Sequence, residues 1–379
     1  MTDSNDILAE AAVLLPDAEI ELAETLRASE ESTVLRVRAR GSTDGPGPRT
    51  LIVKRFATAG DGAAARETAA EGWVRERAAL AVMPPGTPAP RLVASAASPP
   101  LVVMTDAGTG PSVADALLSG SAAEATAALE GFADALAAFH LGTLGIGDSF
   151  RAELAARSGG TVTPAAMPSV AAGAAASLGT WCERLGVPVP EGALPALAEL
   201  PDQVSASGPC SLTPADICPD NNIRGDRGYV LIDFEGAEWR PVAWDAAYLT
   251  VPWPTCWCSF GIPETVTDRI LDRYRTAVAA TLPYAATPGF ARDVALATTG
   301  WALISTAWFI GNALGGDPPQ HDVVAGLPTR RARILDRLAT ARETAPVPEL
   351  AELAGRLRAE LTRRWGEVPL EYAPAFRGN

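Results

Sequence analysis

Short hydrophobic stretches separated by polar or Gly- and Pro-rich segments, such as residues 41–48, characterise the first 104 residues of the chain. This pattern predicts β-strands at residues 19–27, 33–40, 49–56 and 99–104. Over residues 66–82 apolar side chains recur at helical spacing, and this segment ends before two consecutive prolines. The first part of the chain is therefore predicted to be a small sheet with one helix.

The pattern changes after a Gly- and Thr-rich stretch at residues 105–110. Beyond it, Ala- and Leu-rich segments predict helices at residues 113–118, 122–140, 171–185, 266–281, 291–311 and most of 329–365. Strands followed by helices indicate an α+β fold. We expect two lobes: a small β-rich N-lobe over residues 1–104 and a large, mostly helical C-lobe over residues 111–379, joined by a hinge at 105–110.

One turn-rich segment interrupts the helices, between residues 211 and 248, and it predicts a β-hairpin. Ile223-Arg224 and the hydrophobic residues 229–232 flank the sequence Gly-Asp-Arg-Gly, which suits a tight reversal. A turn centred between Asp226 and Arg227 pairs residues whose numbers sum to 453. This register places Asn221 opposite Ile232 and beside Asp233.

Residues 294–316 carry no charge and are long enough to cross a bilayer. They also contain several Thr, Ser and Gly residues, and their flanks lack the Lys/Arg asymmetry that orients a membrane span. We interpret the segment as a buried helix of the C-lobe. A membrane-anchored protein is the alternative.

Charge narrows the range of partners. The chain has 45 acidic and 31 basic residues, a net charge of −14, which argues against nucleic acid or an anionic membrane as partner. Of the basic residues, 30 are arginines, and the single lysine is Lys54. This lysine is either an accident of Arg enrichment or a site where a slim, compact cation is required, such as a narrow phosphate pocket.

Five cysteines, at positions 182, 210, 218, 256 and 258, are too few and too odd in number for a disulfide framework. The two histidines, His140 and His321, lie far apart in the sequence and are expected to be structural, so a zinc site is poorly supported. The acidic N-terminus shows no signal peptide. We therefore expect a cytoplasmic protein with reduced thiols.

Candidate chemistry concentrates around the predicted hairpin. Asn221 and Asp233 offer an amide and a carboxylate oxygen, the kinds of ligand that hold Mg²⁺ in phosphoryl-transfer sites. Asp216, five residues before Asn221, is a candidate to accept a proton from a substrate hydroxyl. Asp and Asn also form ordinary turns, so each residue alone is ambiguous. The ordered spacing of all three favours a catalytic site.

The segment from Asp216 to Leu249 resembles the catalytic segment of the aminoglycoside phosphotransferase and choline kinase-like family, which has the protein-kinase-like fold. Most members carry His-Gly-Asp, an Asn five residues later, an Ile-Asp-aromatic-Glu run and a further Asp before x-Ala. The corresponding residues here are Asp216, Asn221, Asp233 in Ile-Asp-Phe-Glu, and Asp245 in Trp-Asp-Ala-Ala.

The resemblance implies a role for each matching residue. It implies that Asp216 is the catalytic base or orients the acceptor hydroxyl, that Asn221 and Asp233 are the Mg²⁺ ligands, and that Asp245 supports the catalytic loop. The nucleotide-binding residues that it implies are Lys54 on the phosphates, its helix partner Glu76, Ser32 in the phosphate turn, and Thr105 and Ala107 in the hinge.

The chain departs from the family pattern at three places. Pro214-Ala215 replaces the usual His-Gly, and the turn that should cover the phosphates contains Glu30-Glu31 and no glycine. Asn222 follows Asn221 where an apolar residue is common, which leaves a choice between two adjacent asparagines; we assign Asn221.

The resemblance implies transfer of the γ-phosphoryl group of ATP, with Mg²⁺, to a hydroxyl of a small molecule such as an aminoglycoside, a nucleoside or another sugar-containing antibiotic. Trp253 and Trp257 are candidates to stack on this acceptor, or else they fill the groove between helices. No nucleic acid, membrane or obligate protein partner is expected. The departures motivate one alternative, a nucleotide-binding pseudokinase without turnover.

Overall fold

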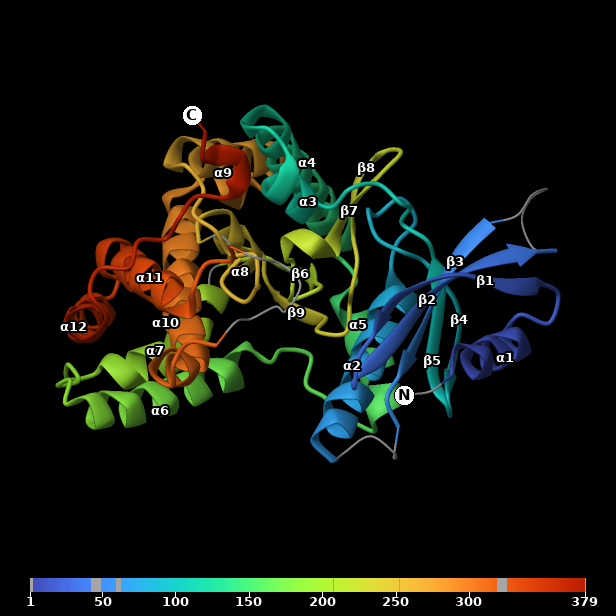
Figure 1. Cartoon of the computed structure of the whole chain (residues 1–379), viewed down its shortest axis with the longest axis horizontal. Helices are drawn as coiled ribbons and strands as arrows, with labels where there is room; N and C mark the ends of the chain where they lie inside the picture. Colours follow the sequence, from blue (N-terminus) through green and yellow to red (C-terminus); the bar gives the residue numbers. More distant parts are fainter. Residues whose placement is uncertain are drawn as a thin grey trace.

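The computed structural model describes residues 3–41, 49–58, 63–206, 208–251, 253–318 and 326–378. The predicted loop at 42–48 and His321 lie outside these residues. Figure 1 shows the N-terminal sheet on one side of the molecule, helices α6 to α12 on the other, and the hairpin β7–β8 between them.

Five antiparallel strands form the N-terminal sheet, in the order β1-β2-β3-β5-β4 (Figure 1). They are β1 (Glu19–Ala28), β2 (Ser32–Arg40), β3 (Arg49–Phe56), β4 (Leu92–Ala97) and β5 (Pro100–Thr105). The four predicted strands agree with β1, β2, β3 and β5 to within one residue at each end. The sequence analysis missed β4, an edge strand whose side chains are all partly or fully exposed, because it lacks a buried hydrophobic face.

The two faces of the sheet pack on different helices because successive side chains of a strand point to opposite sides. Val53 belongs to a cluster that includes Ile7 and Ala11 of α1 (Ser4–Leu14), a helix that the sequence analysis did not predict. The next residue, Lys54, lies on the opposite face, where Phe56 packs with α2 (Ala63–Val82). Strand alternation therefore directs the single lysine toward α2 and the helical region.

Helices build most of the remainder of the chain, as the sequence predicts. They are α3 (Val113–Ser119), α4 (Ala122–Thr143), α5 (Gly147–Ser158), α6 (Met167–Leu185), α7 (Ala193–Ser205), α8 (Ala243–Ala246), α9 (Glu264–Ala279), α10 (Pro288–Leu314), α11 (Arg330–Thr344) and α12 (Pro348–Trp365), with 3₁₀ turns at Pro219–Asn221, Ala247–Leu249, Pro283–Ala286 and Pro374–Phe376. The structure adds α5, α7 and the short α8 to the prediction. The division at 105–110 stays a prediction, although β5 ends at Thr105 and α3 begins at Val113.

Helix covers most of residues 329–365, as expected, and it is divided into two helices, α11 and α12, by residues 345–347. Ala345 and Val347 both precede a proline, and both have extended ψ angles, of 120° and 109°. A residue before proline is disfavoured in the helical conformation, so the chain leaves the helix there. Pro348 then starts α12, since proline is tolerated at the first helical position.

Helix α10 runs through the centre of the helical region, in contact with α6, α7, α8 and α11. By length and composition it is apolar enough to cross a membrane, but 78% of its most apolar stretch is buried inside the molecule. Trp301 of α10 packs edge-on against Trp244 and Tyr248. The predicted buried helix is confirmed.

Two small antiparallel ladders lie between the sheet and these helices. The first pairs β6 (Cys210–Thr213) with β9 (Glu238–Pro241). The second is the predicted hairpin, β7 (Asn222–Gly225) with β8 (Gly228–Leu231). Asn222 pairs with Leu231, and the Ile232 N–H donates to Asn221 O over 3.0 Å. The predicted register is confirmed.

We predict that Gly300→Ala destabilises the fold. A Cβ at Gly300 would lie 2.7 Å from Cη2 of Trp244, whose ring is fully buried. Overpacking of this kind costs about 1–3 kcal/mol. Gly173→Ala in α6 is the matched control, because its Cβ meets nothing within 4 Å. Alanine there should add about 0.5–1 kcal/mol. Urea unfolding followed by circular dichroism measures both, and equal effects would contradict the packing argument.

Candidate active site

The single lysine lies in an ion cluster where the sheet meets the helical region. Lys54 Nζ lies 2.6 Å from Asp233 Oδ1 and 2.8 Å from Glu76 Oε2. Its third partner is Glu235, whose Oε2 is 2.9 Å away. β3 supplies the lysine, α2 supplies Glu76, and the loop between β8 and β9 supplies the other two carboxylates. The structure brings together the predicted Lys54, Glu76 and Asp233, and it adds Glu235.

Charge balance in this cluster favours a further cation. Burial opposes the charge of Lys54, but Asp233, Glu76 and Glu235 outweigh it and raise the pKa of the ammonium well above its ordinary value. Burial would likewise raise the pKa of Asp233, but the charge and hydrogen bond of Lys54 hold it below the ordinary value. Three carboxyl groups thus face one ammonium, although burial raises the pKa of Glu76 to about 7 and the Arg27 guanidinium lies 3.9 Å from Asp233. A divalent cation at Asp233 would offset the negative charge that remains.

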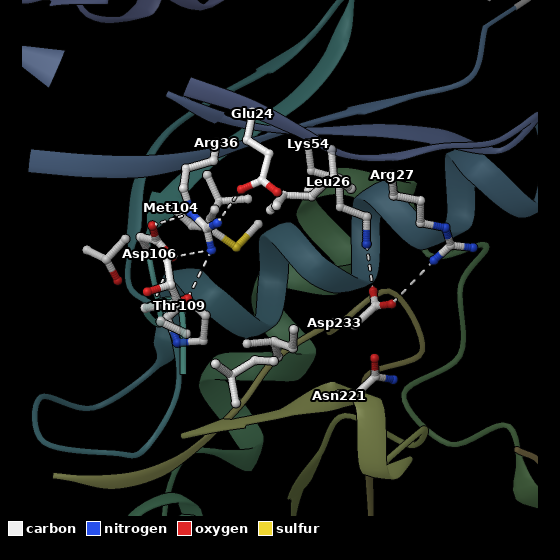
Figure 2. Close-up of a pocket in the computed structure, with 18 of the residues that line it drawn as sticks. Glu24, Leu26, Arg27, Arg36, Lys54, Met104, Asp106, Thr109, Asn221 and Asp233 are labelled. Carbon is white, nitrogen blue, oxygen red and sulfur yellow. Dashed lines mark hydrogen bonds and ion pairs between the residues drawn. The ribbon is translucent and has the colours of Figure 1, made fainter. Parts of the chain in front are cut away.

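The predicted metal ligands lie close together at the open side of the cluster. Figure 2 shows the side chain of Asn221 directly below the carboxylate of Asp233. Asn221 Nδ2 donates to Asp216 O over 3.0 Å, which leaves the amide oxygen for another partner. Asn222 is instead fully buried and donates to Cys218 O, which separates the two adjacent asparagines. An amide and a carboxylate oxygen, both hard ligands, fit Mg²⁺.

A cavity of about 630 Å³ opens beside the cluster, between the sheet and the hairpin (Figure 2). Ile52 lines it from the sheet, whereas Ile223 and Ile232 line it from the hairpin segment. The predicted hinge residues Thr105 and Ala107 also line it. The volume lies within the range of small-molecule sites.

Ser32 is the predicted nucleotide residue that the structure does not bring to this cavity. It is buried at the start of β2 and is not among the described residues that line the cavity. Ser29 Oγ accepts its N–H over 3.1 Å, and a tight turn results. Glu30 and Glu31, which the sequence places in this turn, are exposed and lie outside the same lining.

Arg36 of β2 joins the strands to the predicted hinge at the other end of the cavity (Figure 2). Its Nε donates to Asp106 Oδ2 over 2.8 Å, and its NH2 donates to Gly108 O over 2.9 Å. Its NH1 contacts Glu24 Oε2 at 2.8 Å. The sequence analysis missed this arginine, because its partner Asp106 is 70 residues away.

Asp216 lies on the other side of Asn221, with its side chain open to solvent. Its Oδ1 accepts a hydrogen bond from Thr255 Oγ1 over 3.1 Å. The surrounding protein displaces water, and this desolvation, helped by the charges of Asp233 and Asp220, raises the pKa of Asp216 to about 6. The Thr255 bond acts in the opposite direction. A carboxyl group with this pKa is half ionised at pH 6 and mostly ionised at pH 7, where it can accept a proton.

A buried network supports the catalytic loop where the family pattern has His-Gly. Ala215 takes a left-handed φ of 67°, a conformation that glycine adopts without strain. Its carbonyl accepts a hydrogen bond from Arg240 NH2 over 3.3 Å. Arg240 also binds Asp245 Oδ1 at 2.5 Å, and His140 Nε2 lies 3.0 Å from Asp245 Oδ2. Asp245 therefore contacts the loop through Arg240.

Asp245 is ionised within this network at neutral pH. Burial would raise the pKa of Asp245, but the adjacent Arg240 and the hydrogen bond from His140 lower it to about 2. His140, expected to be structural, is fully buried in the network, and its Nδ1 lies 2.7 Å from the hydroxyl of Tyr274.

The expectation of reduced thiols throughout is wrong for one pair. Cys218 and Cys256 form a disulfide, with their Cα atoms 5.9 Å apart. Cys182, Cys210 and Cys258 are free. The bridge joins the catalytic loop to the segment that carries Thr255, and Cys218 Sγ lies 2.9 Å from Asp216 Oδ1. Cysteine count does not reveal a bridge across 38 residues that only the fold brings together.

The two tryptophans proposed for the acceptor differ in position. Trp253 is 1% exposed and belongs to the hydrophobic core, so it is not placed to stack on a ligand. Trp257 lines a second cavity, of about 640 Å³, together with Asp216 and Asn221, and its Nε1 donates to Asp220 Oδ2 over 2.8 Å.

Trp301 and Trp308, which the sequence analysis did not assign to the acceptor, line a third cavity with Asp216, of about 660 Å³. Trp308 is 46% exposed.

The functional residues that the sequence analysis missed differ in whether the sequence around them indicated a role. Glu235 stands two residues after Asp233, inside the motif itself, and its spacing was a usable sign. Arg240 and Thr255 carry no local sign, because their partners are 25 and 39 residues away.

The small sheet, the helical region and the ion cluster between them define a protein of the protein-kinase-like fold. The model of the phosphotransferase enzyme family matches residues 26–286. The chain belongs to this family and is a small-molecule kinase that phosphorylates a hydroxyl group. The match includes Lys54, Asp216 and Asp233.

Several solved structures are similar to this chain at low sequence identity. An ethanolamine kinase from Plasmodium vivax is 11% identical, with a TM-score of 0.50 over 89% of this chain and 84% of the other. A choline kinase from Cryptosporidium parvum is 9% identical, with a TM-score of 0.49 over 96% of this chain and 95% of the other. A thermostable mutant of an aminoglycoside phosphotransferase is 14% identical, with a TM-score of 0.42 over 96% of this chain and 99% of the other. No curated protein sequence is significantly similar to the chain.

We predict that the Asp216 carboxyl group titrates near pH 6 and that Thr255→Val moves its midpoint upward. The valine removes the hydrogen bond that lowers the pKa and leaves the desolvation that raises it. Thr250→Val is the control, because the Thr250 hydroxyl bonds to Ala247 and Thr298 instead. Carbon NMR of labelled aspartate carboxyl groups measures the midpoints. Equal midpoints in wild type and Thr255→Val would contradict the assigned role of the hydroxyl.

Proposed function

We propose that the protein transfers the γ-phosphoryl group of ATP, with Mg²⁺, to a hydroxyl of a small molecule. One observation carries this proposal: the nucleotide-sized cavity and the cavity beside Asp216 share Asn221 and Asp233 in their walls. A triphosphate in the first cavity and a hydroxyl in the second would meet at these residues. A cytoplasmic location, where ATP is available, is part of the proposal.

In the proposed reaction each side chain has a defined task. Lys54 would hold the triphosphate, and Asn221 and Asp233 would hold Mg²⁺, which supplies positive charge to the phosphate oxygens. Asp216 would orient the acceptor hydroxyl and take its proton as the new oxygen–phosphorus bond forms. The bond between the γ-phosphorus and the bridging oxygen breaks, and ADP leaves. Positioning and charge neutralisation supply most of the rate.

Asp216 and Glu235 line the third cavity as well as the second, and the charges of the third cavity support an acceptor that extends into it with amino groups. Glu235 and Asp216 present carboxyl groups to the third cavity, whereas its arginines are buried in ion pairs, Arg75 with Glu71 and Arg240 with Asp245. The half-exposed Trp308 offers an aromatic face to a cation or a sugar ring. We therefore propose an aminoglycoside, a nucleoside or another sugar-containing antibiotic, or a related amino sugar, and hence a role in resistance or self-protection.

We predict that Asp216→Asn lowers the rate of phosphoryl transfer by about 10²–10⁴-fold, because the amide does not accept the hydroxyl proton. Wild type and variant are incubated with ATP, Mg²⁺ and a panel of amino sugars and nucleosides, and mass spectrometry detects a gain of about 80 Da, the mass of one phosphoryl group. Asp226→Asn, at the exposed hairpin turn, is the matched control and should keep the wild-type rate.

Turnover by Asp216→Asn at the wild-type rate would contradict its role as base. Nucleotide binding by the wild type without transfer to any acceptor would instead favour the pseudokinase alternative.

We predict that Lys54→Arg lowers turnover by on the order of 10²-fold. The ammonium fits between three carboxylates at 2.6–2.9 Å and is only 5% exposed, so the wider guanidinium fork does not fit. Arg38→Lys, at an exposed position of β2, is the control and should have no effect. Unchanged turnover and nucleotide affinity in Lys54→Arg would show that the single lysine is an accident of composition.

A further inference from the structure

Arg27, at the end of β1, lies where the two proposed substrate cavities meet. It lines the nucleotide cavity and also the second cavity, which contains Asp216. Figure 2 shows its side chain reaching down toward Asp233 on the same side as Lys54. Its NH1 lies 3.9 Å from Asp233 Oδ2, and the side chain is 49% exposed. Among the described residues, it is the basic one shared by both walls.

The turn after Arg27 keeps most of its backbone donors for itself. Ser29 Oγ accepts the N–H groups of Glu31, over 3.3 Å, and of Ser32, over 3.1 Å. The Ser29 N–H donates to Ser32 O over 2.9 Å. A phosphate turn normally offers such N–H groups to its ligand. Here three of them already have partners, so positive charge for the phosphates must come mainly from side chains.

Lys54 alone does not supply that charge at the point of transfer. Its ammonium contacts Asp233, Glu76 and Glu235, and its side chain is nearly fully buried at the inner end of the cavity. The guanidinium of Arg27, by contrast, has one ion pair within the described part of the chain, at 3.9 Å, and exposed ion pairs of this kind are weak. It is therefore free to exchange Asp233 for a phosphate oxygen.

We propose that Arg27 is a catalytic residue that binds the γ-phosphoryl group during transfer, a role that rests on the proposed function. Its guanidinium leaves Asp233 and donates to the γ-phosphoryl oxygens, over which the charge of the transferring group is spread while the bond to the bridging oxygen breaks and the bond to the acceptor oxygen forms. Arg27 keeps its protons throughout, and the hydroxyl proton passes to Asp216. The arginine thus replaces the backbone donors that the turn withholds.

The test compares nucleotides with and without a γ-phosphoryl group. Calorimetry in the presence of Mg²⁺ measures the affinity of wild type and Arg27→Gln for ADP and for the non-hydrolysable β,γ-imido analogue of ATP. We expect Arg27→Gln to bind the analogue about 10-fold more weakly and ADP within twofold of wild type, and to lose about 10²-fold in kcat. Arg27→Lys, which keeps the charge, should recover part of both losses.

Arg40→Gln is the matched control. Arg40 lies in the neighbouring strand, and its NH2 is likewise 3.9 Å from a carboxylate, that of Glu21, but it lines neither cavity. We expect wild-type affinities and kcat for this variant. Thermal unfolding checks that the folds match, and Arg27→Lys gives the comparison if the glutamine variant is unstable.

Each other outcome contradicts the inference. Equal weakening of ADP and analogue would place Arg27 on the α- and β-phosphates, and unchanged affinity and kcat would remove it from catalysis. Failure of the wild type itself to bind either nucleotide would overturn the proposed function. This result is distinguishable from the two outcomes above, which concern only the Arg27 variant.

Discussion

The burial of one ammonium group among three carboxylates is the interaction on which the site depends. The side chain of Lys54 is almost inaccessible to water. A buried charge is tolerated only when ion pairs and hydrogen bonds compensate for its lost hydration. Its partners come from α2 and from the loop after β8, so the requirement to pair this charge holds the sheet, its helix and the metal-binding loop together. Strand alternation along β3 points the lysine into that position.

A second buried charge network maintains the catalytic loop. Arg240 connects the Ala215 carbonyl to Asp245, and His140 completes the pairing of that carboxylate. These contacts hold a non-glycine residue in a left-handed conformation that has a cost of its own. The loss of the family's His-Gly is therefore compensated from β9 and α4, elements outside the loop.

The loop from Trp253 to Phe260 links the acceptor side to the same carboxylate. Thr255 donates to Asp216, Trp257 donates to Asp220, and the disulfide between Cys218 and Cys256 joins the two segments covalently. From the opposite side, Arg333 and Arg337 of α11 bind the Cys256 carbonyl and the Ser259 hydroxyl. The environment of Asp216 is thus set by helices far along the chain as well as by its own loop.

By itself the sequence determined the features that depend on neighbouring residues: four of the five strands of the sheet, the register of the hairpin that brings Asn221 beside Asp233, the buried helix α10, and the ordered Asp216, Asn221 and Asp233. Periodicity and turn chemistry encode these within a few residues. Only the tertiary structure decided that Glu235 joins Lys54, that Arg240 holds the loop and that Cys218 bonds to Cys256. Such contacts join residues from separate elements, and their energy arises from burial and pairing that no local pattern records.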